Sequence, residues 1–374
     1  MKRLLLLCVP LAFLTLIGQQ GGAPRLTADT VAELSMRNIP GTFSSGRIAD
    51  VAVDPRNRSV FYVATASGGL WKTVNRGVSF EPIFDNGGSY SLGCVTVDPK
   101  NPDVLWLGSG ENQAQRAIGY GDGVYKSTDA GKTWKNVGLP NSEHIGKIWV
   151  DARNSNTVWV AAQGPLFSAG GDRGLYKTTD GGQTWKASLT ISADTGVTDF
   201  DVDPRNPDIM YAAAYQRRRT TSIIIAGGPE SAIYKTTDAG AHWVKLTEGI
   251  PTVDKGRIAL AVSPQKPDTI YATITTNQQN KLTGMYRSDD AGAHWAKLND
   301  FVVQDPEYYG EIFADPFKEG RVYLMDMAVR VSEDYGKTIT AAGWQVHADN
   351  HSLTFDPTDA NHLLEGNDGG LYET

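Results

Sequence analysis

The segment Ser127-Thr128-Asp129-Ala130-Gly131-Lys132-Thr133-Trp134 decides the fold, because the same pattern recurs along the chain. Self-similarity at a fixed spacing is the sequence signature of a repeat architecture. The copy at Thr178 to Trp185 is nearly complete, and the copies at Asn75 to Phe80 and Asp334 to Ile339 are degenerate. Two further copies run from Asp238 to Trp243 and from Asp290 to Trp295.

The chemistry of this segment is that of a turn. A short Asp side chain accepts hydrogen bonds from backbone amides in the turn, and a Ser or Thr hydroxyl closes the loop. The glycine two residues later supplies a positive φ. His242 and His294 take the position of Thr133, so we interpret both as turn residues. The structural residues of the four best copies are Asp129, Gly131, Trp134, Asp180, Gly182, Trp185, Asp238, Gly240, Trp243, Asp290, Gly292 and Trp295.

A second element precedes each turn and completes a repeating unit. It is an alternating apolar strand that ends in Asp-Pro or a variant, as at Val53-Asp54-Pro55 and Val202-Asp203-Pro204. Period-two alternation bounded by Pro, Asn and Gly is typical of short antiparallel strands. Seven such starts occur, and successive aspartates lie forty-odd to fifty-odd residues apart. The sequence therefore predicts an all-β fold, a β-propeller of about seven four-stranded blades.

The two ends of the chain suggest how the ring closes. The seventh unit begins at His351 and stops after Gly370 to Thr374, before an outer strand. Met36 to Gly41 resembles the outer strand Trp134 to Leu139, so we expect the N-terminal strand to complete the last blade and remove an exposed edge. The alternative is that the chain is the N-terminal part of a longer protein, and the two interpretations are compatible.

The first residues have the layout of an export signal. Met1-Lys2-Arg3 precede an apolar run from Leu4 to Ile17, and small and polar residues follow up to Gly22. This favours a cleaved signal peptide over residues 1–22, a linker over 23–35 and the propeller over 36–374. The alternative is an uncleaved anchor. After cleavage we expect a secreted or periplasmic protein without a transmembrane span, in which Cys94 has no partner for an internal disulfide.

Composition excludes several classes of function. The chain of 374 residues contains 40 glycines, 18 prolines and 9 tryptophans, which is typical of a folded, turn-rich protein. Its net charge of -7 disfavours nucleic acid as a partner, because phosphate binding needs a basic surface. We expect no cofactor.

The turn at Asp129 to Trp134 and its copies resemble the Asp-box repeat superfamily. That superfamily includes sialidases, xyloglucanases of glycoside hydrolase family 74, sortilin-type luminal domains and photosystem II assembly factors. The chain is most similar to exported bacterial sortilin-like or glycosyl-hydrolase-like repeat proteins, as seen in Gly46 to Ile48, Gly68 to Thr73 and Asn367 to Tyr372. The resemblance covers nearly everything after residue 35. It implies the scaffold and leaves the function open, because the same box occurs in enzymes, receptors and assembly factors.

Two departures separate the chain from the hydrolases in this superfamily. The family 74 enzymes carry a catalytic aspartate in the first blade, just before a Gly-Gly-x-Tyr/Trp segment, where this chain has Ser67. A serine cannot replace a carboxylate as a general acid or base. Sialidases use an arginine triad and a tyrosine nucleophile. Arg47 in Gly46-Arg47-Ile48 is only weakly similar to the arginine segment with which sialidases begin.

Candidate ligand-binding residues lie in the loops that a propeller brings to its central channel. They are charged or aromatic residues that begin inner strands or follow second strands, and their arginines suit an anionic or sugar-like ligand. The alternative interpretation is that they are solvated loop charges. The set is Arg47, Glu111, Arg116, Tyr215, Arg217, Arg257, Tyr309, Glu311 and His351.

Two smaller constellations carry chemistry of their own. His347, Asp349 and His351 occupy alternate positions, so on a strand their side chains share a face and are candidate metal ligands. The alternative is that they are ordinary polar residues of a loop. We expect no metal. Glu111 and Glu311 are the catalytic candidates for a glycosidase, which needs two carboxyl groups across the scissile bond. Their separation does not follow from sequence.

These observations leave two functions from different classes. The leading hypothesis is an exported propeller that binds a protein, peptide or glycan ligand at the channel mouth in the manner of sortilin. The alternative is a glycoside hydrolase or lyase that acts on a polysaccharide. Ser67 in the first blade favours binding over hydrolysis.

Overall fold

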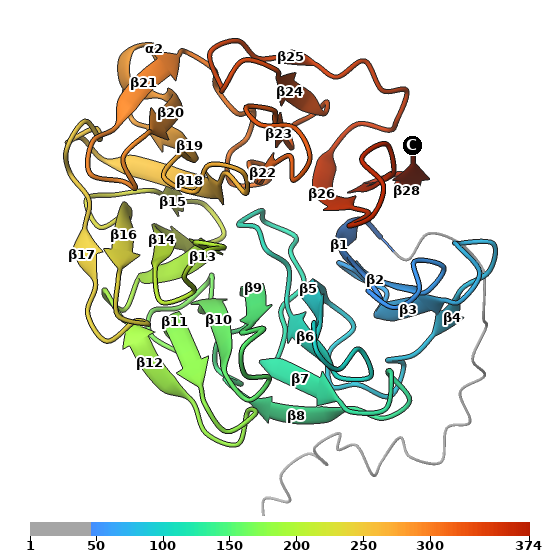
Figure 1. Ribbon diagram of the computed structural model, residues 1–374. Helices are drawn as coiled ribbons and strands as arrows, with labels where there is room; N and C mark the ends of the chain where they lie inside the picture. Colours follow the sequence, from blue (N-terminus) through green and yellow to red (C-terminus); the bar gives the residue numbers. More distant parts are fainter. Residues whose placement is uncertain (1–45) are drawn as a thin grey trace, which may run out of the picture. The chain divides into compact units, whose positions relative to one another are not determined.

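The computed structural model describes residues 46–374. These residues form seven antiparallel sheets arranged as blades in a ring, and the chain visits the blades in sequence order (Figure 1). The prediction of an all-β propeller with about seven blades is confirmed. The predicted signal peptide, the linker and the closing strand at Met36 to Gly41 lie outside the described residues.

Each blade is built from consecutive strands, and the first strand of each blade lies next to the axis. Blade 1 contains β1 (Ile48–Val53), β2 (Phe61–Thr65), β3 (Leu70–Thr73) and β4 (Glu81–Pro82). Blade 2 contains β5 (Leu92–Val97), β6 (Leu105–Ser109), β7 (Val124–Ser127) and β8 (Lys135–Gly138). Blade 3 contains β9 (Ile145–Val150), β10 (Val158–Gln163), β11 (Arg173–Thr178) and β12 (Lys186–Leu189).

The remaining blades follow the same order with two variations. Blade 4 contains β13 (Thr195–Val202), β14 (Met210–Arg219), β16 (Ala232–Thr236) and β17 (Val244–Lys245), with the extra strand β15 (Ile224–Ala226) on β14. Blade 5 contains β18 (Lys255–Val262), β19 (Ile270–Thr276), the short helix α2 (Gln279–Leu282), β20 (Gly284–Ser288) and β21 (Ala296–Asn299). Blade 6 contains β22 (Ile312–Ala314), β23 (Val322–Leu324), β24 (Arg330–Ser332) and β25 (Thr340–Ala341), and blade 7 contains β26 (Asn350–Phe355), β27 (Leu363–Asn367) and β28 (Gly370–Glu373).

Blade 7 has three strands within residues 46–374, so the predicted pattern of four strands is complete in the other six blades. None of the helices in this part of the chain is long and apolar enough to cross a membrane. The core consists of separate apolar layers between adjacent blades, in which middle-strand residues such as Trp106 and Trp159 are buried. The middle strands β2, β6 and β10 are buried along their whole length, because each sheet packs both of its faces against a neighbour.

The recurring aspartates hold the turns between the third and fourth strands. Asp129 accepts hydrogen bonds from the Ser127 hydroxyl at 2.8 Å, the Thr133 amide at 2.9 Å and the Thr133 hydroxyl at 2.6 Å. The same pattern recurs at Asp180, where the tryptophan that ends the turn, Trp185, donates from Nε1 to the Val137 carbonyl of blade 2 at 2.8 Å. The turn therefore shapes its own hairpin and also fastens it to the preceding blade.

The basic residue that recurs in the third strands joins each of blades 1 to 5 to the next blade. Lys126 donates from Nζ to the Gly181 carbonyl at 2.9 Å, and this ammonium lies 4.7 Å from the Trp106 ring centroid. Lys177 repeats the arrangement with the Ala239 carbonyl at 3.1 Å and the Trp159 ring at 4.7 Å. A cation over an aromatic face is stabilising, so the repeat carries its own junction between blades.

Candidate functional site

A β-bulge near the start of the inner strand recurs in six of the seven blades described. A bulge places two residues opposite one and turns a side chain away from the regular ladder. The bulges at Ala49, Gly93, Gly146, Thr198 and His351 all line a cavity of about 140 Å³ near the axis, which we call the axial cavity. The Asp-box aspartates do not line this cavity, because their turns lie at the opposite ends of the strands.

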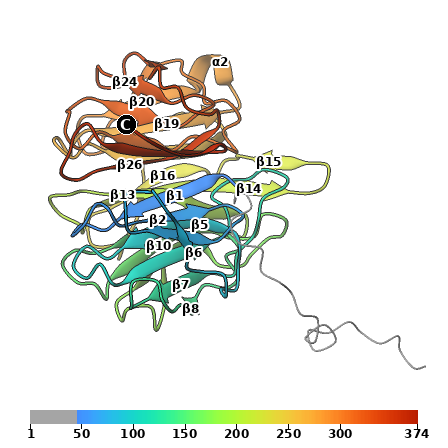
Figure 2. The same cartoon turned by 90° about the vertical axis from the view of Figure 1, so that its right-hand side faces the viewer.

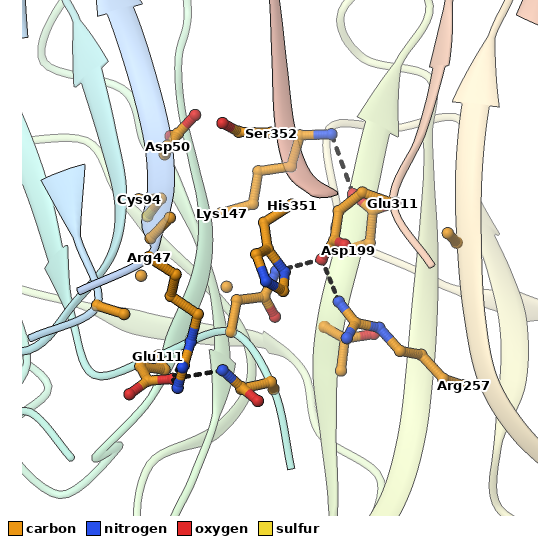
Figure 3. Close-up of a pocket in the computed structure, with 18 of the residues that line it drawn as sticks. Arg47, Asp50, Cys94, Glu111, Lys147, Asp199, Arg257, Glu311, His351 and Ser352 are labelled. Carbon is orange, nitrogen blue, oxygen red and sulfur yellow. Dashed lines mark hydrogen bonds and ion pairs between the residues drawn. The ribbon is translucent and has the colours of Figure 1, made fainter. Parts of the chain in front are cut away.

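Three ion pairs occupy most of the charge around the axial cavity. Arg47 binds the carboxylate of Glu111, and Arg257 binds that of Glu311 (Figure 3). Lys147 donates from Nζ to Asp199 at 3.0 Å. Figure 3 shows the Arg47 pair on one side of the cavity and the Arg257 pair on the other. A ligand in this cavity would therefore meet charges that are already paired, and breaking a buried pair is costly.

The loop between β6 and β7 reaches across the centre of the ring (Figure 1), and we call residues 111–120 the cross-loop. Arg217 of blade 4 donates to the Gln113 carbonyl at 2.5 Å, and Arg219 donates to the Ala114 carbonyl at 3.1 Å. The Ala114 amide donates to the Glu307 carbonyl, ahead of blade 6, at 2.8 Å. The cross-loop thus lies over the axis as part of the fold itself.

Several of the predicted ligand-binding residues are buried beneath the cross-loop or beside it. Glu111, Tyr215 and Arg217 are 3, 2 and 1% exposed, and Arg257 and Tyr309 are also buried. Burial lowers the pKa of Arg217 to about 9, and the nearby Arg173 adds to the effect. Glu111 and Arg217 bind atoms of the cross-loop, whereas Arg257 is paired with Glu311 and Tyr309 with Asp349. Each buried polar group has a partner close at hand, as burial requires. From the same set, Arg116 is exposed on the cross-loop.

The candidate catalytic residues Glu111 and Glu311 both form hydrogen bonds with other side chains of the propeller. Glu111 accepts hydrogen bonds from Arg47, from Gln113 and from the Gly119 amide at 2.9 Å, so it closes the base of the cross-loop. Glu311 is bound by Arg257 and by Asn112 Nδ2 at 3.1 Å. A glycosidase needs one carboxyl group kept protonated and another open to substrate. In this structure both carboxylates are occupied by an arginine and by an amide side chain.

A second group of polar side chains lies at the edge of the axial cavity, and we call it the mouth cluster: Arg47, Tyr308, His351 and Asp368. Asp368 accepts hydrogen bonds from the Tyr308 hydroxyl at 2.8 Å and contacts His351 Nε2 at 3.0 Å. The Arg47 guanidinium lies 5.4 Å from the Tyr308 ring centroid. The side chain of Asp368 is 28% exposed. The mouth cluster therefore presents a supported carboxylate that solvent can reach.

Electrostatics keep that carboxylate ionised. Burial acts to raise the pKa of Asp368, but the hydrogen bonds from His351 and Tyr308 outweigh it and lower the pKa below its ordinary value. Burial and the bond to Asp368 raise the pKa of the Tyr308 hydroxyl, so Tyr308 remains a donor. A charged acceptor beside an aromatic ring and a guanidinium is a suitable surface for sugar hydroxyls.

The metal candidates are not brought together. His347 is exposed, with Nδ1 2.7 Å from the Ala348 carbonyl, whereas the His351 ring stacks on Tyr309 and contacts Asp368. Asp349 accepts a hydrogen bond from the Tyr309 hydroxyl. Across residues 46–374 no group of three or more His, Cys, Asp or Glu side chains could hold a metal ion.

Other carboxylates near the axis join neighbouring blades. Asp50 accepts from the Val95 amide of blade 2 at 2.9 Å, and Asp199 accepts from the Leu260 amide of blade 5 at 2.9 Å. Burial raises the pKa of Asp50 to about 7, against the effect of its backbone hydrogen bonds. Because its position is fixed by the Val95 amide, we assign Asp50 to the junction between blades 1 and 2.

Sequence reasoning missed Asp368 and Tyr308 as individual site residues. Asp368 occupies the turn between the second and third strands of blade 7, the place that Ser67 takes in blade 1. A comparison of these turns repeat by repeat would have singled it out. Tyr308 lies in the loop before β22 and has no counterpart in the repeat, so only the fold identifies it.

Comparison with known proteins agrees with this architecture. The Sortilin-Vps10 family profile (Sortilin, neurotensin receptor 3) matches residues 122–284. The oligoxyloglucan-reducing end-specific xyloglucanase of Emericella nidulans is 23% identical over 90% of this chain and 45% of its own length. The xyloglucanase of Hypocrea jecorina is 24% identical over 90% of this chain and 48% of its own length. The chain thus spans less than half of either curated relative.

Two solved structures share the fold at low identity. A family 74 glycoside hydrolase from Niastella koreensis has a TM-score of 0.58 at 18% identity, over 88% of this chain and 57% of the other. YCF48 from Cyanidioschyzon merolae has a TM-score of 0.58 at 15% identity, over 89% of this chain and 97% of the other. The chain is an Asp-box β-propeller. Within that class it resembles the Sortilin-Vps10 proteins and the family 74 xyloglucanases.

Proposed function

We propose that this propeller binds a polysaccharide at the mouth cluster and takes part in its hydrolysis. The observation that carries the proposal is the position of Asp368, which is partly exposed, ionised and held by Tyr308 and His351 beside Arg47. The similarity to two xyloglucanases supports xyloglucan as the first polysaccharide to test. This interpretation replaces Glu111 and Glu311 as the candidate reactive groups.

Binding and hydrolysis make different demands on this chain. Hydrolysis needs two carboxyl groups that flank the glycosidic bond. The mouth cluster supplies one, and the nearby Asp349 is engaged by Tyr309. We therefore propose that the mouth cluster contributes glycan binding to the reaction, and that cleavage needs a second carboxyl group that the mouth cluster does not supply.

Isothermal titration calorimetry with xyloglucan oligosaccharides tests the binding step. The wild-type chain should bind, and Asp368→Asn should weaken binding by about tenfold or more, since a hydrogen bond to a charged group contributes about 1.5–3 kcal/mol. Glu81→Gln on the exposed strand β4 is the matched control and should bind as the wild type does. Equal affinity for Asp368→Asn and the wild type would refute the proposal.

Tyr308→Phe refines the same test. Loss of the hydroxyl removes one donor from Asp368 but keeps the ring over which Arg47 lies. Affinity should fall by a smaller factor than in Asp368→Asn. The pH below which binding is lost should move upward, because the Asp368 carboxylate loses a hydrogen bond that lowers its pKa. An unchanged pH profile would contradict the role given to this tyrosine. A reducing-sugar assay on the same samples should show no turnover.

A protein or peptide at the channel mouth, the other sequence-based hypothesis, is less well supported there. Two arginines that we expected to bind such a ligand are already engaged: Arg217 binds the cross-loop and Arg257 binds Glu311. We therefore favour a glycan as the ligand of the mouth cluster.

We also propose that the mature protein is exported, on the basis of the basic start and apolar run of residues 1–17. N-terminal sequencing of protein from a fractionated bacterial host should find cleavage near residue 22 and protein in the periplasm or medium. Recovery of the full chain from the cytoplasm alone would contradict export.

A further inference from the structure

Blade 4 carries a feature that the repeat does not require. β14 is ten residues long, and its last part pairs with β15 through Arg217 with Ala226, Arg218 with Ile225 and Arg219 with Ile224. This hairpin projects beyond the blades (Figure 2). Within residues 46–374, β15 pairs with β14 alone, so its other edge has no strand beside it. An open strand edge is a template for pairing with another chain.

A groove of about 920 Å³ runs along that open edge. One side is formed by β15 and the following residues up to Gly228, and the other by residues 302–307 and Met327 of blade 6. Residues 254–256 and 275–277 of blade 5 complete it. Gly228 and Lys255 form a short bridge, with their amides donating to each other's carbonyls at 2.9 and 3.4 Å, which closes one end of the edge.

The side chains on the groove give it a definite chemical character. Ile225, Val302 and Met327 line the groove and are 46, 37 and 48% exposed. Exposed apolar side chains that gather in one groove indicate an interaction site. The lining contains no aromatic side chain, in contrast to the mouth cluster. A sugar ring would find no platform on which to stack, whereas the apolar side chains of an extended peptide would find Ile225, Val302 and Met327.

Charge defines the peptide further. Asp254, Asp305 and Glu307 line the groove, and none of them forms an ion pair with another residue between 46 and 374. The ammonium of Lys255, the basic residue of the lining, donates to the Pro251 and Val253 carbonyls at 3.0 and 3.1 Å. The groove therefore presents net negative charge, and a complementary partner carries basic side chains.

We propose that this groove binds an extended basic peptide segment of a partner protein, which adds a strand to the open edge of β15. Main-chain hydrogen bonds to β15 would provide affinity. Ile225 and Met327 would accept the apolar side chains of the peptide, and the three carboxylates would accept its lysines or arginines. The site is separate from the mouth cluster, so it does not depend on glycan binding.

The test uses the whole chain and a synthetic seven-residue peptide of alternating lysine and valine. Fluorescence anisotropy should show saturable binding, and hydrogen exchange should slow at residues 224–228. The same peptide with N-methyl groups on alternate amides of one edge should lose binding, because methylation removes the donors that strand addition needs. An alternating glutamate and valine peptide should not bind.

Variants locate the site. Asp305→Asn combined with Glu307→Gln should weaken binding about fivefold, consistent with two partly exposed charge pairs. Glu81→Gln on β4 should have no effect. Loss of peptide binding with xyloglucan binding retained would affirm two separate sites. Equal binding of the N-methylated peptide, or slowed exchange elsewhere without slowing at 224–228, would overturn the proposal, as would absence of any binding by the lysine and valine peptide.

Discussion

Asn112 donates a hydrogen bond from Nδ2 to Oε1 of Glu311 over 3.1 Å, which joins the cross-loop of blade 2 to the residue before β22 in blade 6. This hydrogen bond, like that from the Ala114 amide to the Glu307 carbonyl, links two blades on opposite sides of the axis. Together with the arginines of blade 4, it turns a loop that could have formed a ligand-binding mouth into part of the fold. We therefore propose the mouth cluster and the β15 groove, and not the space under the cross-loop, as the places where ligands bind.

The first prediction concerns Arg217, which holds the cross-loop. Arg217→Ala leaves the Gln113 and Gly164 carbonyls without their donor and removes a fully buried side chain. We expect the free energy of unfolding to fall by about 2–4 kcal/mol, measured by urea denaturation. Arg116→Ala on the exposed part of the same loop is the control and should change it by less than about 0.5 kcal/mol. Equal effects would show that the loop is not anchored by blade 4.

The second prediction concerns the bulge in the inner strand of blade 2. A Cβ on Gly93 would lie 2.3 Å from the Ile145 carbonyl and 2.4 Å from the Gly110 carbonyl, both of them backbone atoms. Gly93→Ala should therefore destabilise the protein by about 1–3 kcal/mol. Ala49, the equivalent residue in blade 1, already carries a Cβ, so Ala49→Gly provides the comparison and should cost less. Thermal unfolding followed by circular dichroism would distinguish the two.

The third prediction tests the junction made by the recurring lysine. Lys177→Met removes the donor to the Ala239 carbonyl and the cation over Trp159, but keeps an apolar stem of similar length. We expect a loss of about 1 kcal/mol of stability. Lys186→Met on the exposed outer strand β12 is the matched control. If both variants unfold at the same denaturant concentration as the wild type, the lysines contribute nothing to the junctions.

The fourth prediction is acid sensitivity from the Asp boxes. Hydrogen bonds from the Thr133 hydroxyl and amide lower the pKa of Asp129 to about 2, and those from His294 lower the pKa of Asp290 to about 2. The folded pKa lies below the unfolded value of about 3.9. The stabilisation is therefore complete above about pH 4 and is lost as the pH falls towards 2. Melting temperatures from pH 6 to 2 should fall over that window, and less so in Asp129→Asn.

The fifth prediction concerns closure of the ring. β28 is the outermost described strand of blade 7, and the sequence predicts that Met36 to Gly41 pairs with it. Deletion of residues 36–41 should lower the melting temperature and increase aggregation through the exposed edge. Deletion of residues 26–31 within the predicted linker is the control. Identical behaviour of the two deletions would contradict closure by this strand.

Some of the site was accessible to sequence reasoning. The sequence indicates Arg47, Glu311 and His351 because they begin inner strands, and all three line the axial cavity. The sequence also indicates Arg217 and Glu111, but as ligand-binding residues; in the structure Arg217 binds the cross-loop and Glu111 binds Arg47. Their partners lie 104 and 64 residues away in the chain. No local sequence pattern indicates which distant loop a buried arginine will contact. The structural roles of Arg217 and Glu111 could therefore not be predicted from the sequence.

By itself, the sequence determined the repeat. Hydrogen bonds in the Asp box join residues two to four apart, and strand alternation has a period of two, so both are written locally and predict an all-β ring of about seven blades. The tertiary structure alone decided which charges remain available. Loop lengths and the closure of the ring bring the cross-loop onto the axis, pair Glu111 with Arg47 and Glu311 with Arg257, and leave Asp368 partly exposed. The physical reason is that a turn is stabilised by its own neighbours, whereas a charge is satisfied by whatever the whole fold places within hydrogen-bonding distance.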